Sequence, residues 1–374
     1  MADVAPDPPA HRPATLAVRM RRPPRVFDPE TCPPSTLYLA MSTSGICNFR
    51  CRMCHIWMNQ DRQDELSVAR RVEIVREFAA LNPGGTVFIP GGEVTLDPPQ
   101  LFALASACRA EGLACGIVTN GSRIVDEEFA NALVASGLTS ISVSLDSQVP
   151  AVHEYMRGMP GCFAHTIRAI RLLLQARAAH NPRLTVRTSC VLCRLNIETL
   201  PGYLQFCADL GVDHAGFQLL SGTFSNRSGT RDDFFDKHFW HDAASKARAK
   251  AVIEGVLTPG ETRLRFEERE RLAWMQRYID DPHFETGDPV CGSHERNLMI
   301  DPQGNAALCF GSKAILEEPY LGNVATSDVR ALWTGDRARA ARLVMDRCRL
   351  SCGTLHCHRR PPRRAPARTM TTPD

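Results

Sequence analysis

The stretch that decides the fold reads Thr36-Leu37-Tyr38-Leu39-Ala40-Met41, followed shortly by Cys47-Asn48-Phe49-Arg50-Cys51-Arg52-Met53-Cys54. The first part is apolar and β-prone, which predicts a strand, and the second part places three cysteines on the loop that follows it. Three thiolates at this spacing can hold three irons of a four-iron cluster, so that the fourth iron stays open to a substrate or cofactor. A zinc site is the alternative, because His55 is adjacent and zinc needs a fourth ligand.

Outward from this stretch, apolar β-prone runs alternate with stretches of helical spacing, several of which end at a glycine. Six strands alternating with five helices predict βα units and a parallel sheet, an α/β fold that forms a partial (β/α)6 barrel. In such sheets the chemistry lies at the carboxyl ends of the strands. The expected strands are Thr36–Met41, Thr86–Pro90, Ala114–Thr119, Ser140–Leu145, Leu184–Leu192 and His214–Leu220, and the expected helices are Arg70–Leu81, Gln100–Ala110, Glu127–Ser136, Phe163–Ala179 and Glu198–Leu210.

Small and polar residues follow several of these strands. Gly91 and Gly92 come after the second strand, where glycine lets a backbone approach a ligand closely, and Glu93 could accept a hydrogen bond from an ammonium group. The same three residues also suit an ordinary turn. Asn120 follows the third strand in the sequence Thr-Asn-Gly, which is typical of a tight turn. Its side chain could form that turn or reach into the site.

A second group of cysteines lies in the last quarter of the chain: Cys291, Cys309, Cys348, Cys352 and Cys357. Cys309 ends a predicted β-hairpin, whose strands flank the turn Pro-Gln-Gly-Asn, and a helix is expected over Val329–Met345. Thiols that flank a hairpin and a helix indicate a compact module held together by metal. Since a fully thiolate-ligated cluster takes four cysteines, these five predict one cluster; zinc bound by four cysteines is the alternative.

In its first two thirds the sequence resembles the radical S-adenosylmethionine (SAM) superfamily, whose hallmark is Cys-x3-Cys-x2-Cys after the first strand. The resemblance extends over roughly residues 36–220. It implies a [4Fe-4S] cluster on Cys47, Cys51 and Cys54, and SAM at its open iron. The side chains and glycines that it implies around SAM are Gly91, Gly92 and Glu93 at the methionyl amine, Ser144 in the Ser-Leu-Asp stretch, Arg157 facing the carboxylate, Asn120 reaching into the site, and Leu219 beside the adenosine. The family's proline after the glutamate is Val94 here.

The C-terminal part resembles the auxiliary-cluster modules of radical SAM enzymes called SPASM and Twitch. The Gly-x4-Cys hairpin that ends at Cys309 and the following Leu321-Gly322-Asn323-Val324 carry this resemblance. It implies one auxiliary [4Fe-4S] cluster held by Cys291, Cys309 and two of Cys348, Cys352 and Cys357, with the first two preferred.

The resemblance implies an oxidoreductase that cleaves SAM reductively to a 5′-deoxyadenosyl radical and abstracts a hydrogen atom from its substrate. We expect a net oxidation of a small natural-product or sugar-like substrate, with an electron donor such as flavodoxin or ferredoxin. A ribosomal-peptide maturase, which would epimerise or cross-link a peptide, is the alternative from the same superfamily. A non-catalytic zinc or iron–sulfur scaffold is a more remote one.

Composition sets the remaining expectations. The chain has 374 residues, a formal net charge of +3 and 15 cysteines. A nearly balanced charge does not favour nucleic acid as a partner, and short interrupted apolar runs do not favour a membrane protein. We expect a cytoplasmic protein, in which these cysteines are not a disulfide framework. The expected domains are a disordered extension at 1–35, the barrel at 36–222, a connecting region at 223–285, the auxiliary-cluster domain at 286–358 and a disordered basic tail at 359–374.

Overall fold

The computed structural model describes residues 27–41, 46–58, 64–222, 232–257, 269–284 and 292–349. Its strands form one sheet in the order β6-β5-β4-β3-β2-β1-β7-β8-β9. The first six pair in parallel, each with the next along the chain, and the two ends of the sheet do not pair with each other. The expected α/β partial barrel is therefore confirmed. These strands are β1 Thr36–Leu39, β2 Thr86–Ile89, β3 Ala114–Thr119, β4 Ser140–Ser144, β5 Thr185–Leu192 and β6 His214–Leu219.

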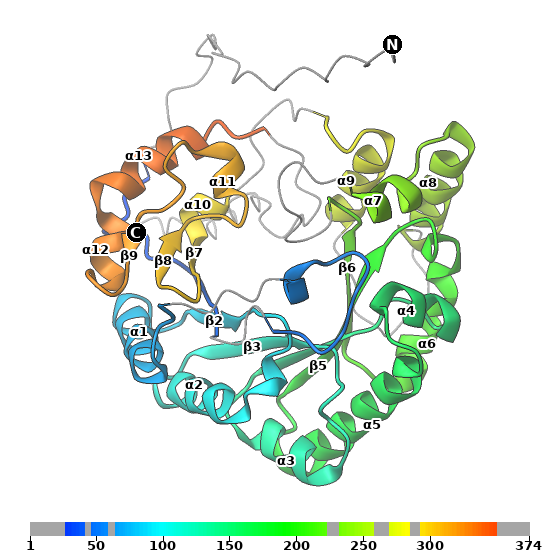
Figure 1. Ribbon diagram of the computed structural model, residues 1–374, viewed down its shortest axis with the longest axis horizontal. Helices are drawn as coiled ribbons and strands as arrows, with labels where there is room; N and C mark the ends of the chain where they lie inside the picture. Colours follow the sequence, from blue (N-terminus) through cyan, green and yellow to red (C-terminus); the bar gives the residue numbers. More distant parts are fainter. Residues whose placement is uncertain are drawn as a thin grey trace, which may run out of the picture.

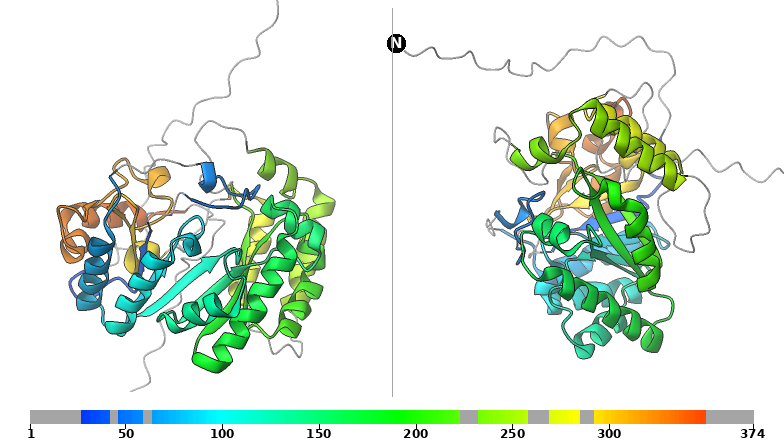
Figure 2. Two further views of the ribbon diagram at one scale, coloured as in Figure 1. Left: turned by 60° about the horizontal axis from the view of Figure 1, so that its bottom comes forward. Right: turned by 90° about the vertical axis from the view of Figure 1, so that its right-hand side faces the viewer.

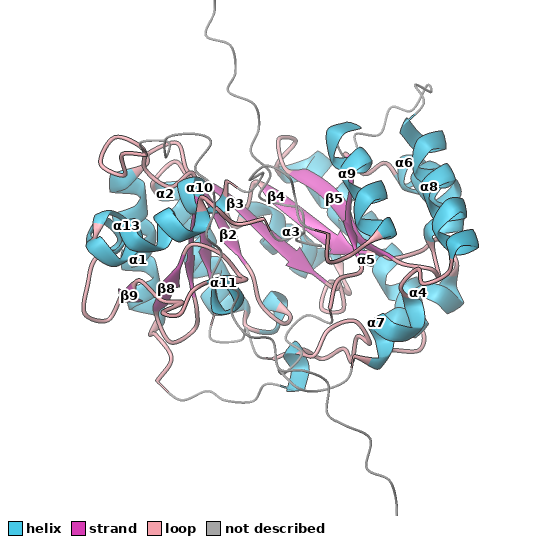
Figure 3. Cartoon of the chain, turned by 90° about the horizontal axis from the view of Figure 1, so that it is seen from above, coloured by secondary structure: helices cyan, strands magenta, loops and turns pink. Residues whose placement is uncertain are grey.

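The helices between these strands cover the outer, convex side of the sheet (Figure 1; Figure 3). The alternation of buried and partly exposed side chains along β5 explains this arrangement. Val186 and Cys190 are buried against the helices, while Arg187 and Ser189 are partly exposed on the other side. Helix starts follow the local sequence: the Ser67 side chain accepts from the amide of Arg70. The helices are α1 Val68–Leu81, α2 Pro98–Ala110, α3 Glu127–Ala135, α4 Pro150–Arg157, α5 Cys162–His180 and α6 Leu200–Leu210.

The C-terminal hairpin is present, and it continues the barrel sheet. Strand β7 Asn297–Ile300 pairs in parallel with β1, β8 Asn305–Ala307 pairs antiparallel with β7, and β9 Gly322–Asn323 pairs with β8. The helix expected over 329–345 is two helices, because Gly335 adopts an extended conformation between them. The remaining helices are α7 Asp233–His238, α8 Ala243–Leu257, α9 Arg269–Asp280, α10 Ser293–Arg296, α11 Ser312–Ile315, α12 Val329–Thr334 and α13 Asp336–Met345.

A buried arginine joins the barrel to the hairpin. Arg71 on α1 is 0% exposed, and its guanidinium donates to the carbonyls of Ala40 after β1, Leu66 before α1 and Pro302 in the turn between β7 and β8. Helix α12 also packs beside α1, as Figures 1 and 2 show, and the Val329 amide donates to Glu77 at 2.9 Å. The C-terminal segment is thus tied to the first βα unit of the barrel.

The ends of the expected domains fall partly outside the described residues. Residues 1–26, the tail from 350 onward and parts of the connecting region are among these, so their expected disorder stays a prediction. Phe27, however, contacts Trp333 edge to face at 6.1 Å, and the carbonyl of Cys32 accepts from the Trp333 indole at 3.1 Å. The end of the expected extension therefore packs on α12. Within the described residues, no helix is long and apolar enough to cross a membrane.

Candidate active site

The cysteine loop follows β1 and folds back on itself. Cys51 is buried, Cys47 and Cys54 are partly exposed, and all three are free thiols. The indole Nε1 of Trp57 donates to the Cys54 carbonyl at 2.8 Å. Arg50 lies 4.9 Å from the centre of the Trp57 ring and donates to the Cys47 carbonyl at 2.8 Å. These contacts fix the backbone on both sides of Cys51, so that the three thiols share one short, ordered segment.

The pKa values of these thiols indicate what kind of group the loop can bind. Burial raises the pKa of Cys47 to about 12 and that of Cys54 to about 11, and it also raises the pKa of Cys51. Neighbouring thiolates raise the pKa values of Cys47 and Cys54 further. Three gathered thiols therefore need a strongly cationic group before they can all ionise, and a bound metal supplies that charge. The donor set fits a four-iron cluster held by three cysteines.

The glycines after β2 lie directly behind the first cysteine. A Cβ on Gly92 would come within 2.0 Å of the Ile46 carbonyl oxygen and 3.2 Å of the Cys47 Cβ. The amide of Glu93 donates to that same carbonyl at 2.8 Å. Position 92 must therefore be glycine for the loop to dock on the end of β2. Gly91 and Gly92 were predicted to contact the SAM amine; that contact stays a prediction, and their place beside Cys47 is compatible with it.

The Glu93 carboxylate lies inside the protein, where it joins the ends of β2 and β3. It is 0% exposed and accepts from the Thr95 amide at 3.1 Å, the Thr95 hydroxyl, the Thr119 hydroxyl at 2.7 Å and the Asn120 amide at 2.6 Å. Burial raises its pKa, and these four donors act in the opposite direction. Its predicted contact with the SAM amine remains untested, and the structure assigns its oxygens four partners within the protein.

Asn120 belongs to the site by its side chain. The amide Nδ2 donates to Asn48 Oδ1 at 2.9 Å and lies 4.0 Å from the Cys47 sulfur. Asn48 in turn donates to the Ser122 hydroxyl at 2.8 Å. The turn after β3 thus holds the residue that follows Cys47. Whether Asn120 also contacts SAM stays a prediction.

Arg157 lies against the middle cysteine and is paired with Asp146, a residue that the sequence analysis did not single out. Arg157 Nε is 2.6 Å from Asp146 Oδ2, and Nη2 donates to Asp146 Oδ1 at 3.0 Å. The remaining nitrogen, Nη1, is 3.9 Å from the Cys51 sulfur. The Arg157 side chain is 11% exposed and that of Asp146 is 0% exposed. The predicted partner of Arg157, the SAM carboxylate, would therefore have to share a guanidinium that Asp146 already engages.

Helix α4, which the sequence analysis also missed, carries Arg157 and docks on the cysteine loop. The amide and Nε of Arg52 donate to the carbonyls of Met156 and Tyr155, at 2.9 and 3.0 Å. A Cβ on Gly158, which has a φ of +62°, would meet the Arg50 carbonyl oxygen at 2.1 Å. The signal was available in the sequence, since Pro150 stands in the first turn and Gly158 at the C-terminal cap of α4.

Two further predicted residues lie on opposite faces of the sheet. Ser144 ends β4 opposite Ser189 of β5, and it alternates with Val143, which is 0% exposed in the main core. By this alternation Ser144 faces the concave side, as a SAM contact would require. Leu219, by contrast, belongs to the main core, whereas its neighbour Leu220 packs with Cys51 beneath the cysteine loop. The adenosine contact predicted for Leu219 stays untested, and Leu220 is better placed for it.

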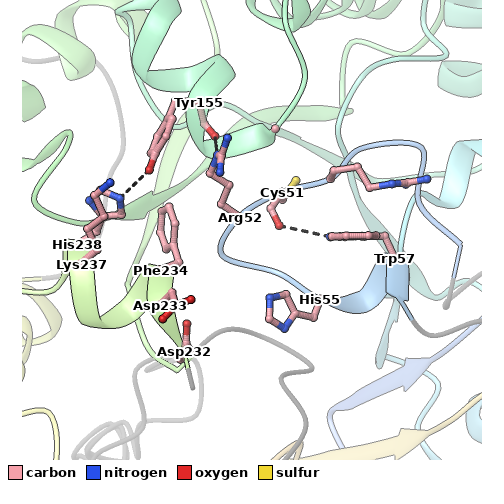
Figure 4. Close-up of a pocket in the computed structure, with 12 residues that line it drawn as sticks. Cys51, Arg52, His55, Trp57, Tyr155, Asp232, Asp233, Phe234, Lys237 and His238 are labelled. Carbon is pink, nitrogen blue, oxygen red and sulfur yellow. Dashed lines mark hydrogen bonds between the residues drawn. The ribbon is translucent and has the colours of Figure 1, made fainter. Parts of the chain in front are cut away.

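A pocket of about 540 Å³ opens between the cysteine loop and α7 (Figure 4). Tyr155 and His238 face each other across one side of it, with the Tyr155 hydroxyl 3.0 Å from His238 Nε2. Burial lowers the pKa of His238, and Lys237 acts in the same direction. The residues that line the pocket are Arg50, Cys51, Arg52, His55, Trp57, Tyr155, Gly158, Asp232, Asp233, Phe234, Lys237 and His238.

The second cysteine group is described only in part. Cys309 and Cys348 are free thiols of intermediate exposure, and Cys291, Cys352 and Cys357 lie outside the described residues. The residues around them are brought together nevertheless. The Ser293 hydroxyl, two residues after Cys291, donates to the Leu308 carbonyl at 2.6 Å.

A similar contact links the same segment to the third cysteine of the group. His294 Nε2 is 3.7 Å from Asp346 Oδ1, two residues before Cys348. The neighbours of Cys291, Cys309 and Cys348 therefore meet at one place, which fits a shared cluster. The complete ligand set stays a prediction.

Comparisons with known proteins agree with this geometry. Residues 41–207 match the model of the radical SAM superfamily, and residues 291–358 match the SPASM iron–sulfur cluster-binding domain. The chain is thus a radical SAM protein of the partial-barrel class. More specifically, it belongs to those with a C-terminal SPASM module, and these two domains imply SAM, a [4Fe-4S] cluster and an auxiliary cluster.

Several curated and solved proteins are similar to this chain. One is an AdoMet-dependent heme synthase of Methanosarcina barkeri, 26% identical over 46% of this chain and 48% of that protein. Another is the mycofactocin maturase MftC of Mycobacterium ulcerans, 27% identical over 75% of this chain and 69% of that protein. The chain spans about half the length of the curated heme synthases that it matches.

Among solved structures, Streptococcus suis SuiB bound to S-adenosylmethionine has the same fold. The TM-score is 0.62 at 17% identity, and the match covers 85% of this chain and 73% of that chain. SuiB bound to its precursor peptide SuiA aligns with a TM-score of 0.59, at 16% identity over 85% of this chain and 72% of that chain. At this identity the likeness supports the fold and nothing finer.

Proposed function

We propose that this chain is an oxidoreductase that abstracts a hydrogen atom from a substrate held against the concave face of the sheet, and that the auxiliary cluster accepts one electron from the resulting substrate radical, which also loses a proton. One observation carries the proposal: both cysteine sites border the same strand. The cysteine loop follows β1 directly, and the hairpin that ends at Cys309 pairs with β1 through β7. A substrate on the concave face of β1 and its neighbours would lie between the two sites.

A row of aromatic rings runs from the second site onto that face. Phe310, next to Cys309, contacts the Tyr38 ring of β1 at 5.2 Å, and Tyr38 contacts the Phe88 ring of β2 at 5.6 Å. Phe310 is 55% exposed. Rings of this kind give an apolar wall on which a substrate can pack close to the auxiliary cysteines.

The opposite part of the face is polar. Ser142 and Ser144 of β4 and Ser189 of β5 alternate with core residues, and they therefore face the concave side. Gly116 of β3 lies at the border between the two parts, because a Cβ there would meet Phe88 at 3.2 Å. The face thus offers rings on one side and hydroxyl groups on the other, which suits a substrate with an apolar part beside polar groups.

When bound, the first cluster and SAM would supply the reductive cleavage that makes hydrogen-atom abstraction possible. The protein holds and shields them. Gly92 and Glu93 bring the end of β2 against Cys47, and Asn120 fixes the segment after it. Because of this position beside Cys47, we assign Gly91, Gly92, Asn120 and Ser144 to the SAM site. Arg157 we assign to the contact with Cys51.

A peptide substrate is the second candidate. The relative MftC is a maturase, and SuiB has been solved with a precursor peptide. A peptide with an aromatic side chain would satisfy the same concave face, with its ring on Tyr38 and Phe88 and its amides near the serines. A small natural product with a sugar-like part would satisfy it as well.

The experiment uses the full chain, reconstituted anaerobically to about eight irons, the sum of two four-iron clusters. Deuterated candidate substrates of both kinds are offered with SAM and a reductant. From one class we expect deuterium in 5′-deoxyadenosine and, with the same substrate unlabelled, a product two mass units lighter than that substrate. Deuterium transfer from the labelled substrate, together with a product of unchanged mass from the unlabelled one, would reject the oxidation and favour epimerisation. No substrate-dependent 5′-deoxyadenosine with any member of either class would reject both substrate classes.

A further inference from the structure

Cys51 differs from the other two cysteines of the loop in its electrostatic surroundings. Arg157 Nη1 lies 3.9 Å from the Cys51 sulfur. The Cys47 sulfur instead has the neutral side-chain amide of Asn120 4.0 Å away. One ligand of the cluster is therefore paired with a buried cation.

Arg157 is held in this position from two sides. Asp146 engages Nε and Nη2, and the Asp146 carboxylate itself accepts from the Val191 amide of β5 at 3.0 Å. On the other side, the end of α4 is fastened to the cysteine loop through Arg52 and Gly158. The third nitrogen, Nη1, is thereby directed at the Cys51 sulfur, 3.9 Å away.

Asp146 is itself anchored by the surrounding backbone. Its amide donates to His153 Nδ1 at 3.2 Å, and its carbonyl accepts from Asn196 at 2.7 Å. The carboxylate is 0% exposed, so a ligand that drew Arg157 away would leave a buried negative charge without its partner. Arg157 is thus better suited to remain on Asp146 than to move to another carboxylate.

We propose that the Asp146–Arg157 pair positions a guanidinium against the Cys51 sulfur and raises the reduction potential of the first cluster through that single ligand. A positive charge beside a cluster thiolate stabilises the reduced, more negative state, and hydrogen bonds to the sulfurs act in the same direction. Arg157 is accordingly a positioning residue for the cluster. The proposal rests on the cluster at Cys47, Cys51 and Cys54, and it is independent of which substrate is oxidised.

The test is a redox titration of the full-length reconstituted protein without SAM or substrate, followed by electron paramagnetic resonance. The signal that changes when SAM is added identifies the first cluster. In Arg157→Gln we expect at least a tenfold lower ratio of reduced to oxidised cluster at a fixed potential, which is about 59 mV for a one-electron couple. Arg157→Lys keeps the charge without the planar fork, so its shift should be smaller and in the same direction.

Arg123→Gln is the matched control, because it removes an exposed positive charge from the turn that carries Asn120 and takes no part in holding Arg157. Water and salt screen that charge, so the potential should not change measurably. An unchanged SAM-free potential in Arg157→Gln, with weakened SAM binding, would overturn the proposal and return Arg157 to the SAM carboxylate. If Arg157→Gln does not load a cluster, Arg157→Lys decides: a lowered potential supports the proposal, and a wild-type potential overturns it. Substrate-dependent 5′-deoxyadenosine in the wild type tests the proposed function separately.

Discussion

We expect the cysteine loop and the C-terminal cysteines to bind the same kind of cluster, and the chain builds the two sites in opposite ways. Cys47, Cys51 and Cys54 lie on one loop, which the ends of β2, β3 and α4 hold by direct contacts. The C-terminal cysteines come from segments far apart in the sequence, joined by contacts such as Ser293 with Leu308. The first site is thus ordered by the barrel around it, and we expect the second to depend more strongly on its cluster to stay assembled.

Removing one cysteine from each site should give the largest contrast. Cys51→Ala should abolish SAM cleavage, because the cluster loses its buried ligand. Cys309→Ala should leave SAM cleavage within about a few-fold of wild type and stop product formation, with the loss of about four irons. Chromatography of 5′-deoxyadenosine and iron analysis measure both. Equal loss of 5′-deoxyadenosine in the two variants would contradict the separation of roles.

Acid should destabilise the region of the first site through His153. Burial lowers the pKa of His153 to about 4, from an ordinary value of 6.5. The unfolded chain binds that proton first as the pH falls, so the free energy of unfolding should drop between about pH 6.5 and pH 4, by about 3 kcal/mol in total. Urea unfolding across this range, compared with His153→Gln, measures the contribution.

The matched control for this prediction is His165, which is exposed on α5. His165→Gln should keep the wild-type pH dependence, whereas His153→Gln should flatten it. A His153→Gln curve parallel to wild type would show that another group carries the acid sensitivity.

Gly92→Ala should test how closely the loop rests on the barrel. The new Cβ would fall 2.0 Å from the Ile46 carbonyl oxygen, so either the loop or β2 must shift. We expect a loss of about 1–3 kcal/mol in the free energy of unfolding, as for other overpacked sites, and reduced iron at the first cluster only. Gly84→Ala is the control, since its Cβ would meet nothing nearer than 4.0 Å. Normal iron loading in Gly92→Ala would reject the close approach.

Ser293→Ala should have the smallest effect and act at the second site. It removes the hydrogen bond to the Leu308 carbonyl, which is worth about 1 kcal/mol, and should loosen the auxiliary cluster during anaerobic chelator treatment. Ser136→Ala, which removes a similar bond to the Leu133 carbonyl far from both sites, is the control. If Ser293→Ala and Ser136→Ala both release iron at the wild-type rate, the Ser293 hydrogen bond does not hold the second site together.

The sequence predicted the barrel well because its signals are local. Every expected strand and helix between residues 36 and 220 is present, with ends that differ by a few residues, since period and caps are written in neighbouring positions. The three-cysteine loop was equally visible, as its ligands stand within eight residues. Helix α4 was missed because it is only 8 residues long, too short for periodicity to stand out.

Contacts between distant segments could not be predicted in the same way. Nothing in the local pattern of residues 297–300 indicates that they pair with β1, and the hairpin was therefore expected to be a separate module. The Asp146–Arg157 pair was also invisible, because it depends on how α4 is placed relative to β4. A glutamate such as Glu93 is the right residue type to bind an ammonium group. Its carboxylate points into the protein because Thr119 and Asn120, at the end of β3, donate hydrogen bonds to it.

The pairing of β1 with β7 also means that β1 is synthesised long before its partner strand. Contacts at this junction join positions 261 apart in the chain, as between Ser35 and Arg296. At a translation rate of about 5–20 residues per second, the ribosome needs on the order of 10 to 50 seconds to deliver the second partner. During that interval β1, the strand that leads into the cysteine loop, has an open edge that can pair with other nascent chains. Truncated products that end before β7 should therefore aggregate more readily than the whole chain.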